Sequence, residues 1–337
     1  MTGQWSSRFD HLEALTSARG MFEHADGVTP RREHGYCVDD NARLLIVMSR
    51  EVDETLTARL SRVALTMCLS ALEPDGRSRN RMDQHGIWTD RADTNDCWGR
   101  NLWALGVASA HHQDPLVRAA SRTGFDLASR QRSRHPRAMA FAALGAAEVY
   151  AREPSHEPAR SLLASFASQF ISAGTAEWPW PEPRLTYANA AVAEATIVAG
   201  VALHRADVLD RGLTMLGWLL ERETIDDHLS VTGMNGSGPL DTKPQFDQQP
   251  IEVAAMADAC WTASSITGDR KWERGIALAG RWFEGLNDTG AVMFDTVTGG
   301  SYDGLQAVGV NSNEGAESTL AFISTFQRVR QLAEVTA

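Results

Sequence analysis

The sequence predicts an all-α fold, an (α/α)6 toroid in which six inner helices are surrounded by six outer helices. Three observations support this fold. Six times, a loop rich in acids, amides and aromatic residues leads directly into a helix of small apolar residues. A second, amphipathic helical stretch lies between successive junctions, and the loops before the inner helices are longer than the turns after them. Such recurrence is typical of stacked supersecondary units, and the six junctions would converge on one pocket.

The predicted inner helices are apolar nearly all round, which indicates burial on every side. The clearest examples are residues 137–147 and 190–203. Both stretches are rich in Ala and Leu rather than in alternating β-branched residues, so a helix is favoured over a strand.

The predicted outer helices are amphipathic. In the stretch 56–69, apolar residues form one stripe, and Arg59 and Arg62 lie off it. Similar stretches occur near 8–24, 114–131, 158–172, 206–222 and 270–286.

The connections between helices are asymmetric. Short turns such as 152–155 and 267–269 follow the inner helices, whereas long loops precede them. Long loops at one end of a scaffold indicate a single functional face. We find no linker or low-complexity tract, so we expect residues 1–337 to form one domain. The long loops are 73–95, 174–186, 223–248 and 287–313.

Composition excludes several classes of partner. The formal charge of −11 and the pI of about 5.4 argue against nucleic acid and anionic membrane surfaces as partners. No apolar run is long enough for a transmembrane helix, and the N-terminus lacks the basic and apolar regions of a signal peptide. We therefore expect a cytoplasmic protein. The four cysteines, which lie in no paired motif and which we expect to be reduced thiols, are Cys37, Cys68, Cys97 and Cys260.

Acidic residues are concentrated at the junctions. Any one of them can be explained as a helix cap or as a partner of the helix dipole, and Gln249-Pro250-Ile251-Glu252 is an ordinary helix start. Together, however, the six starts carry more acids and amides than capping requires. These residues are Asp39, Asp40, Asp96, Glu182, Glu194, Glu252, Glu314 and Glu317, with Asn189 and Asn313.

Aromatic and basic residues accompany the acids. The segment Trp178-Pro179-Trp180-Pro181 holds two indoles on a stiff extended chain, and Trp88 and Tyr187 lie beside other junctions. Aromatic faces of this kind stack on the C–H faces of sugars, although tryptophan also fills gaps in helical cores. The arginines that follow junction acids can bind substrate oxygens or brace carboxylates, and they are Arg43, Arg100 and Arg137.

No metal or cofactor is expected. The chain has no local Cys or His spacing of a zinc site, no dinucleotide-binding glycine motif following a strand, no P-loop and no nucleophile elbow. A zinc site assembled across the toroid is the alternative, from Cys37, Cys97, Cys260, His34, His85 and His135.

Several strings resemble a bacterial group of glycosidase- or glycosyltransferase-like proteins in the six-hairpin glycosidase-like superfamily. They are HGYCVDDNARLL, DCWGRNLWALG, WPWPEPRLTYANA, FDQQPIEVAAMADAC and NSNEGAESTLAFI. The resemblance implies an (α/α)6 toroid and a carbohydrate substrate. The chain departs from the group at Pro181, where W-x-W-F-E is usual, and at Ala188, where T-Y-D-N-A has an acid.

The predicted function is that of an inverting glycoside hydrolase, or a phosphorolytic relative, acting on a sugar in the central funnel. We expect Asp40 and Glu252 to be the catalytic pair, with Glu182 in reserve. Acids on separate inner helices leave room for a water molecule, which favours inversion. The expected substrate-binding residues are Asp39, Asp96, Arg100, Arg137, Trp88, Trp178, Trp180, Tyr187, Asn189, Gln249, Asn313 and Glu314.

Two alternatives stay open at this point. A sugar epimerase or isomerase on the same toroid would use histidine as acid and base, with His34, His85 and His135 as candidates. A carbohydrate-binding protein without turnover would use the same acids only as helix caps.

Overall fold

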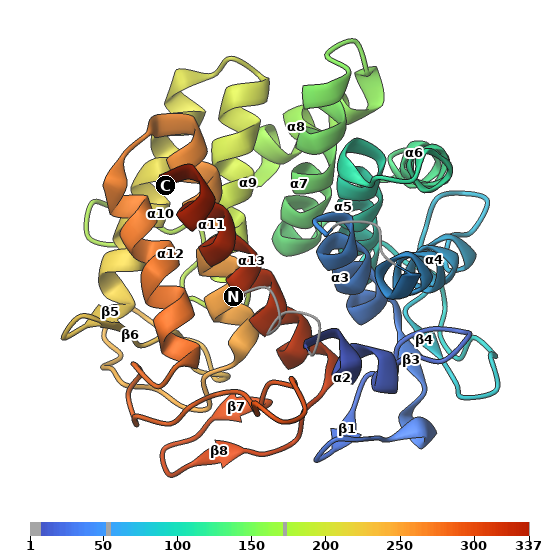
Figure 1. Cartoon of the computed structure of the whole chain (residues 1–337). Coiled ribbons are helices and arrows are strands. Elements are labelled where there is room, and N and C mark those ends of the chain that lie inside the picture. The colour runs from blue at the N-terminus through green and yellow to red at the C-terminus, as the bar shows by residue number, and fades with distance from the viewer. Residues whose placement is uncertain (1–7, 52–54, 171–173, 337) are drawn as a thin grey trace.

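The computed structural model describes residues 8–51, 55–170 and 174–336, and these residues form the predicted toroid (Figure 1). The inner helices are α3 (Val38–Ser49), α5 (Asp96–His111), α7 (Pro136–Arg152), α9 (Asn189–Ala202), α11 (Pro250–Thr267) and α13 (Ala316–Thr336). The outer helices are α2 (Arg8–Leu15), α4 (Thr55–Ser70), α6 (Pro115–Ala128), α8 (Glu157–Phe170), α10 (Ala206–Arg222) and α12 (Arg270–Phe283).

The inner helices form a closed ring. Each packs against the next in chain order, and α13 packs against α3, so the last inner helix closes on the first. Every outer helix packs against at least one inner helix, and α2 joins α13 to α4. The described part of the chain contains no helix that is both long and apolar enough to cross a membrane.

Small residues allow the inner helices to approach closely. A Cβ atom on Gly106 of α5 would lie 2.3 Å from the carbonyl oxygen of Gly145 in α7, and one on Gly99 would lie 2.2 Å from that of Ala138. Only glycine allows two backbones to meet at this separation. The alanine-rich sequence of α7 is therefore required by the packing of the ring.

The loops before α3, α5, α11 and α13 carry short antiparallel strand pairs, which lie in the lower half of Figure 1. These loops lead to the N-terminal ends of the inner helices, so the predicted asymmetry of the connections is confirmed. A 3-10 turn, η1 (Arg32–His34), precedes α3. The pairs are β1 (Ala25–Asp26) with β2 (Thr29–Pro30), β3 (Tyr36–Cys37) with β4 (Arg81–Met82), β5 (Thr224–Ile225) with β6 (His228–Leu229), and β7 (Gly304–Leu305) with β8 (Val310–Asn311).

One predicted helix is shorter than expected. The stretch 8–24 is helical only to Leu15, because the chain turns between Ser17 and Gly20, where the Ser17 amide donates to the Gly20 carbonyl. The apolar residues after the turn then bridge to other segments, as Phe22 does to Tyr36. In the predicted helix 158–172, residues 171 and 172 lie outside the described residues. All four cysteines are free and buried, as predicted.

The close approach of α5 and α7 predicts opposite effects for two glycine substitutions. Gly106→Ala places a methyl group against the Gly145 carbonyl and should lower the free energy of unfolding by about 2 kcal/mol or more. Gly217→Ala, within α10, meets only Trp272 at 3.7 Å and should raise it by about 0.5 kcal/mol. Urea unfolding of both variants measures the difference, and equal stabilities would contradict the packing described above.

Candidate functional site

A cavity of about 500 Å³ lies at the N-terminal ends of the inner helices. Its wall contains residues from the starts of α3, α5 and α13 and from the loops before α9 and α11. Six of the predicted site residues line it: Asp39, Asp40, Asp96, Arg100, Tyr187 and Gln249. Five of the six predicted junctions contribute to this cavity, and the junction before α7 does not.

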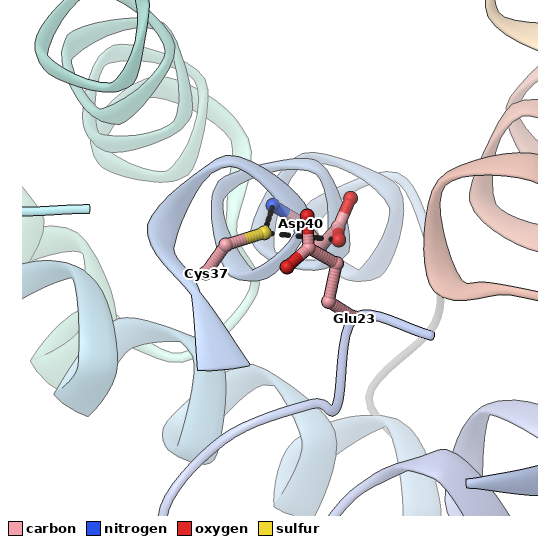
Figure 2. Close-up of side chains that lie close together, drawn as sticks. All are labelled: Glu23, Cys37 and Asp40. Atoms are coloured by element: carbon pink, nitrogen blue, oxygen red, sulfur yellow. Dashed lines mark hydrogen bonds between the residues drawn. The ribbon is translucent and has the colours of Figure 1, made fainter. Parts of the chain in front are cut away.

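Asp40 is held by the start of its own helix. Cys37 is the N-cap of α3, and its sulfur accepts a hydrogen bond from the Asp40 amide at 3.5 Å. The Cys37 thiol donates to Oδ2 of Asp40 at 3.0 Å, as the dashed lines of Figure 2 show. The carboxyl group is only 2% exposed. Burial raises the pKa of Asp40 to about 7, against the opposing effect of Arg43. Asp40 thus keeps a proton up to neutral pH.

Arg43 joins Asp40 to the last inner helix. Its Nη1 donates to Oδ1 of Asp40 at 2.5 Å, and its Nη2 lies 2.5 Å from Oε2 of Glu317 in α13. Of the two roles expected for the junction arginines, Arg43 therefore braces carboxylates, one in its own helix and one in a second helix. The Glu317 carboxylate contributes to the raised pKa of Asp40.

The two carboxylate oxygens of Asp39 differ in their hydrogen bonding. Its Oδ2 accepts a hydrogen bond from the Asn80 side chain at 2.9 Å. Its Oδ1 is buried and accepts no hydrogen bond from any residue that the structure describes, although Nε of Arg100 lies 3.5 Å away. The Arg100 guanidinium lies 4.1 Å from the centroid of the Phe141 ring, which holds it in place.

Asp96 and Tyr187 connect the second inner helix to the loop before α9. The Tyr187 hydroxyl donates to Oδ2 of Asp96 at 2.6 Å, and Tyr187 is 43% exposed. Burial and the Asp96 carboxylate raise the pKa of the Tyr187 hydroxyl well above its usual value. The phenol is therefore a hydrogen-bond donor at every physiological pH.

Glu252, Asn189, Arg137 and Glu182 form a separate network that does not line the cavity. Glu252 is 5% exposed and accepts hydrogen bonds from the backbone amides of Ala188 and Asn189, so it caps α9 from the neighbouring helix. Arg137 donates two hydrogen bonds of 2.8 Å to Glu182 and one of 3.1 Å to Asn189. Burial raises the pKa of Glu252 to about 7.

The remaining predicted residues also lie outside the cavity. Trp180 is 1% exposed, and Trp178 packs edge-on against Trp218 at 4.9 Å, so the two indoles belong to the packing of the ring wall. Trp88 packs beside Met82 in a small apolar cluster. The side chains of Asn313 and Glu314 bond within the loops, Asn313 accepting from the Gly27 amide and Glu314 from the Thr298 hydroxyl.

Other residues of the cavity were not among the predicted site residues. They come from the long loops, where no periodic pattern indicates which side chains point inward. Arg43 and Glu317 were recognised only as junction residues. The loop residues are Glu23, His24, Arg81, Met234, Asp247 and Asp303.

Glu23, Cys37 and Asp40 form a group whose potential ligand atoms lie within 4.8 Å of one another (Figure 2). Each carboxylate is paired with an arginine: Glu23 with Arg81 and Asp40 with Arg43. The Cys37 thiol keeps its proton and donates a hydrogen bond to Asp40, whereas a metal-binding cysteine is a thiolate. The hydrogen bonds and ion pairs of this group satisfy its polar atoms without a cation, and the expected absence of a metal stays a prediction.

No family model matches the chain, and no curated protein matches its sequence. Solved structures with the same fold do match over nearly the whole chain. A sugar epimerase from a ruminal bacterium has a TM-score of 0.71 at 11% identity, covering 97% of this chain and 99% of its own. A D-mannose isomerase has a TM-score of 0.68 at 9% identity, covering 98% of both chains. An α-mannanase from Bacteroides thetaiotaomicron has a TM-score of 0.66 at 9% identity, covering 99% of this chain and 97% of its own. These similarities establish the six-hairpin toroid as the fold of this chain.

Proposed function

We propose that the protein is a carbohydrate-active enzyme that cleaves a glycosidic bond in the N-terminal cavity, with Asp40 as the proton donor. One observation carries the proposal: a buried carboxyl group with a pKa of about 7 lies beside a carboxylate oxygen without a hydrogen bond among the described residues. Glycoside hydrolysis requires such a pair, an acid for the leaving oxygen and a base for the water.

Asp40 meets the requirement for the acid. A carboxylic acid that keeps its proton near neutral pH can transfer it to the leaving oxygen as the bond breaks. Arg43 then stabilises the carboxylate that remains, because its Nη1 is already hydrogen-bonded to Oδ1.

Asp39 meets the requirement for the base. Its Oδ1 can accept a proton from the attacking water, or from phosphate in a phosphorolytic enzyme. Successive residues of a helix point about 100° apart, so the carboxyl groups of Asp39 and Asp40 diverge and leave room for the water. We therefore keep inversion of the anomeric carbon as the expected outcome and assign the base to Asp39 in place of Glu252.

The proposed substrate is a sugar, and two findings support it. The cavity presents acids, three arginines, two amides and the Tyr187 hydroxyl, a set of donors and acceptors that suits hydroxyl groups. The strings that carry the resemblance to the bacterial glycosidase-like group surround this cavity, and we propose that the chain belongs to that group. The structural neighbours are named as sugar-processing enzymes.

A sugar epimerase or isomerase is the second candidate, because His24 lines the cavity with its Nε2 3.7 Å from Glu23. Of the histidines expected for this chemistry, His34 packs edge-on against His24 at 5.1 Å, and His85 and His135 do not line the cavity. Incubation with disaccharides and aryl glycosides separates the candidates. Release of a free sugar supports the hydrolase, an isomeric product supports the epimerase, and binding without either supports a binding protein.

Replacing the proposed acid and base should abolish turnover without unfolding the protein. We expect Asp40→Asn and Asp39→Asn each to lower kcat by a factor of about 100 to 10,000, as the loss of general acid–base catalysis does. Rates are measured on the substrate that the panel identifies, and NMR of the first-formed product should show the inverted anomer.

Glu252→Gln is the matched control, since it changes another buried junction acid with a similarly raised pKa that does not line the cavity. Its turnover should stay within about twofold of the wild type. Loss of turnover in this variant alone, with full activity in Asp40→Asn, would transfer the catalytic role to Glu252.

The raised pKa of Asp40 predicts an alkaline limb in the pH profile. Only the protonated group donates, so kcat/KM should be constant well below pH 7, fall to half near pH 7 and fall about tenfold per unit well above it. Glu317→Gln removes a negative charge that raises this pKa, so the limb should move to lower pH, by about one unit. Glu314→Gln changes a buried acid that does not line the cavity and should leave the limb in place. A limb unmoved in Glu317→Gln would mean that another group titrates.

A further inference from the structure

A second and larger cavity lies at the opposite end of the toroid. Its volume is about 740 Å³, and it shares no lining residue with the N-terminal cavity. Residues from the C-terminal halves of all six inner helices line it, including Ser49 of α3, His111 of α5, Tyr150 of α7, Val201 of α9, Ile266 of α11 and Arg328 of α13, and Arg50 lines it directly after α3. We propose that it is a second binding site, for a neutral, hydroxylated molecule with an apolar face, such as a monosaccharide or disaccharide.

Glu194 is the group that points to a ligand. It lines the cavity from the middle of α9, although it is only 6% exposed. Its Oε1 accepts a hydrogen bond from the Thr262 hydroxyl at 2.7 Å. Its Oε2 has no hydrogen-bond partner within the described part of the chain. A buried polar atom is normally satisfied, so a ligand hydroxyl would complete this carboxyl group.

The charges around Glu194 are balanced. Arg50 and Arg328 both contact Oδ1 of Asp258, at 3.0 and 2.5 Å. Nε2 of His111 lies 2.7 Å from Glu148 on another part of the wall. Burial and the Asp258 carboxylate raise the pKa of Glu194 to about 8, so this group is neutral at pH 7 and can donate a hydrogen bond. A wall with paired charges and both donors and acceptors favours a neutral polar ligand over an ion.

Aromatic rings supply the apolar part of the wall. Trp103, Tyr150 and Trp261 all line the cavity and are each partly exposed. One side of Trp103 is stacked on Phe141 in the ring core, with 5.9 Å between centroids and 7° between planes. Ligand pockets commonly combine such aromatic walls with a few polar groups that fix orientation, in volumes of roughly 300 to 1,000 Å³. Flat C–H surfaces of sugar rings match these faces.

The two cavities are separate sites. Between them lies a gap of about 40 Å³, bordered by Arg43 and Arg100 towards the N-terminal cavity and by Trp103 towards the second one. The two large cavities share no lining residue, so the second site does not depend on the function proposed for the first.

Isothermal titration calorimetry with D-glucose, D-mannose and cellobiose tests the site. The titrations use both the wild type and Asp40→Asn, in which turnover should be lost, so that the heat of binding is separated from the heat of reaction. We expect at least one sugar to bind to both proteins, and the variants of the second cavity assign that binding to it. Glu194→Leu, which deletes the unpartnered oxygen but keeps an apolar side chain, should weaken that binding at least tenfold.

Because Glu194→Leu changes a buried side chain and can unfold the protein, a second variant is made at the surface. Ser265 is an exposed residue of the cavity wall, and Ser265→Arg obstructs the opening. It should weaken binding as Glu194→Leu does, whereas Thr123→Arg on exposed α6 should not change it. Absence of binding by all three sugars, or equal affinity in Glu194→Leu, Ser265→Arg and the wild type, would overturn the proposal. Turnover in the wild type is measured separately, so failure of this site is distinguished from failure of the catalytic proposal.

Discussion

The ion pairs of one arginine, Arg43, organise the candidate site. Its guanidinium bonds to Asp40 in its own helix and to Glu317 in α13, so it acts where the last inner helix of the ring meets the first. The charge that helps to hold this junction also limits the rise in the pKa of Asp40 that burial causes. Closure of the ring and the acidity of the proposed catalytic group therefore depend on the same contact.

The same junction is strengthened further along the helices. Arg50 of α3 donates to Ser324 of α13 at 2.7 Å, and the Gln327 side chain donates to the Val47 carbonyl at 2.9 Å. Each buried polar group at this junction needs its hydrogen-bond partner, because a buried group without one lowers the free energy of unfolding. These contacts align α3 with α13 along their length and so bring Asp40 and Glu317 to one cavity.

Much of the fold could be predicted from the sequence because helical periodicity and loop length are local signals. The alanine-rich stretches of α7 and α9 identify buried helices, and the long loops identify the functional end. The site was predicted only in part. Position in a junction does not determine side-chain direction: Asp40 faces the cavity, whereas Glu252 turns to the amides of Ala188 and Asn189. An acid at the start of a helix can serve either as a cap or as a catalytic group. The packing of neighbouring helices determines which role its position allows.

The tryptophans and the loop residues illustrate the same limit. Trp178 and Trp180 pack with Trp218, a partner on α10 that no local pattern associates with them. Glu23 lies in the stretch 8–24, which was predicted to be one amphipathic helix, and it lines the cavity because α2 ends at Leu15 and the chain turns before residue 23.

The most direct test of the central claim is the titration of Asp40 itself. Carboxyl ¹³C chemical shifts of aspartate-labelled protein can be followed from pH 4 to 9, with the Asp40 signal assigned by its loss in Asp40→Asn. The account predicts an apparent pKa near 7. A midpoint near the ordinary value of 3.8 would show that Asp40 is ionised at neutral pH and cannot be the proton donor.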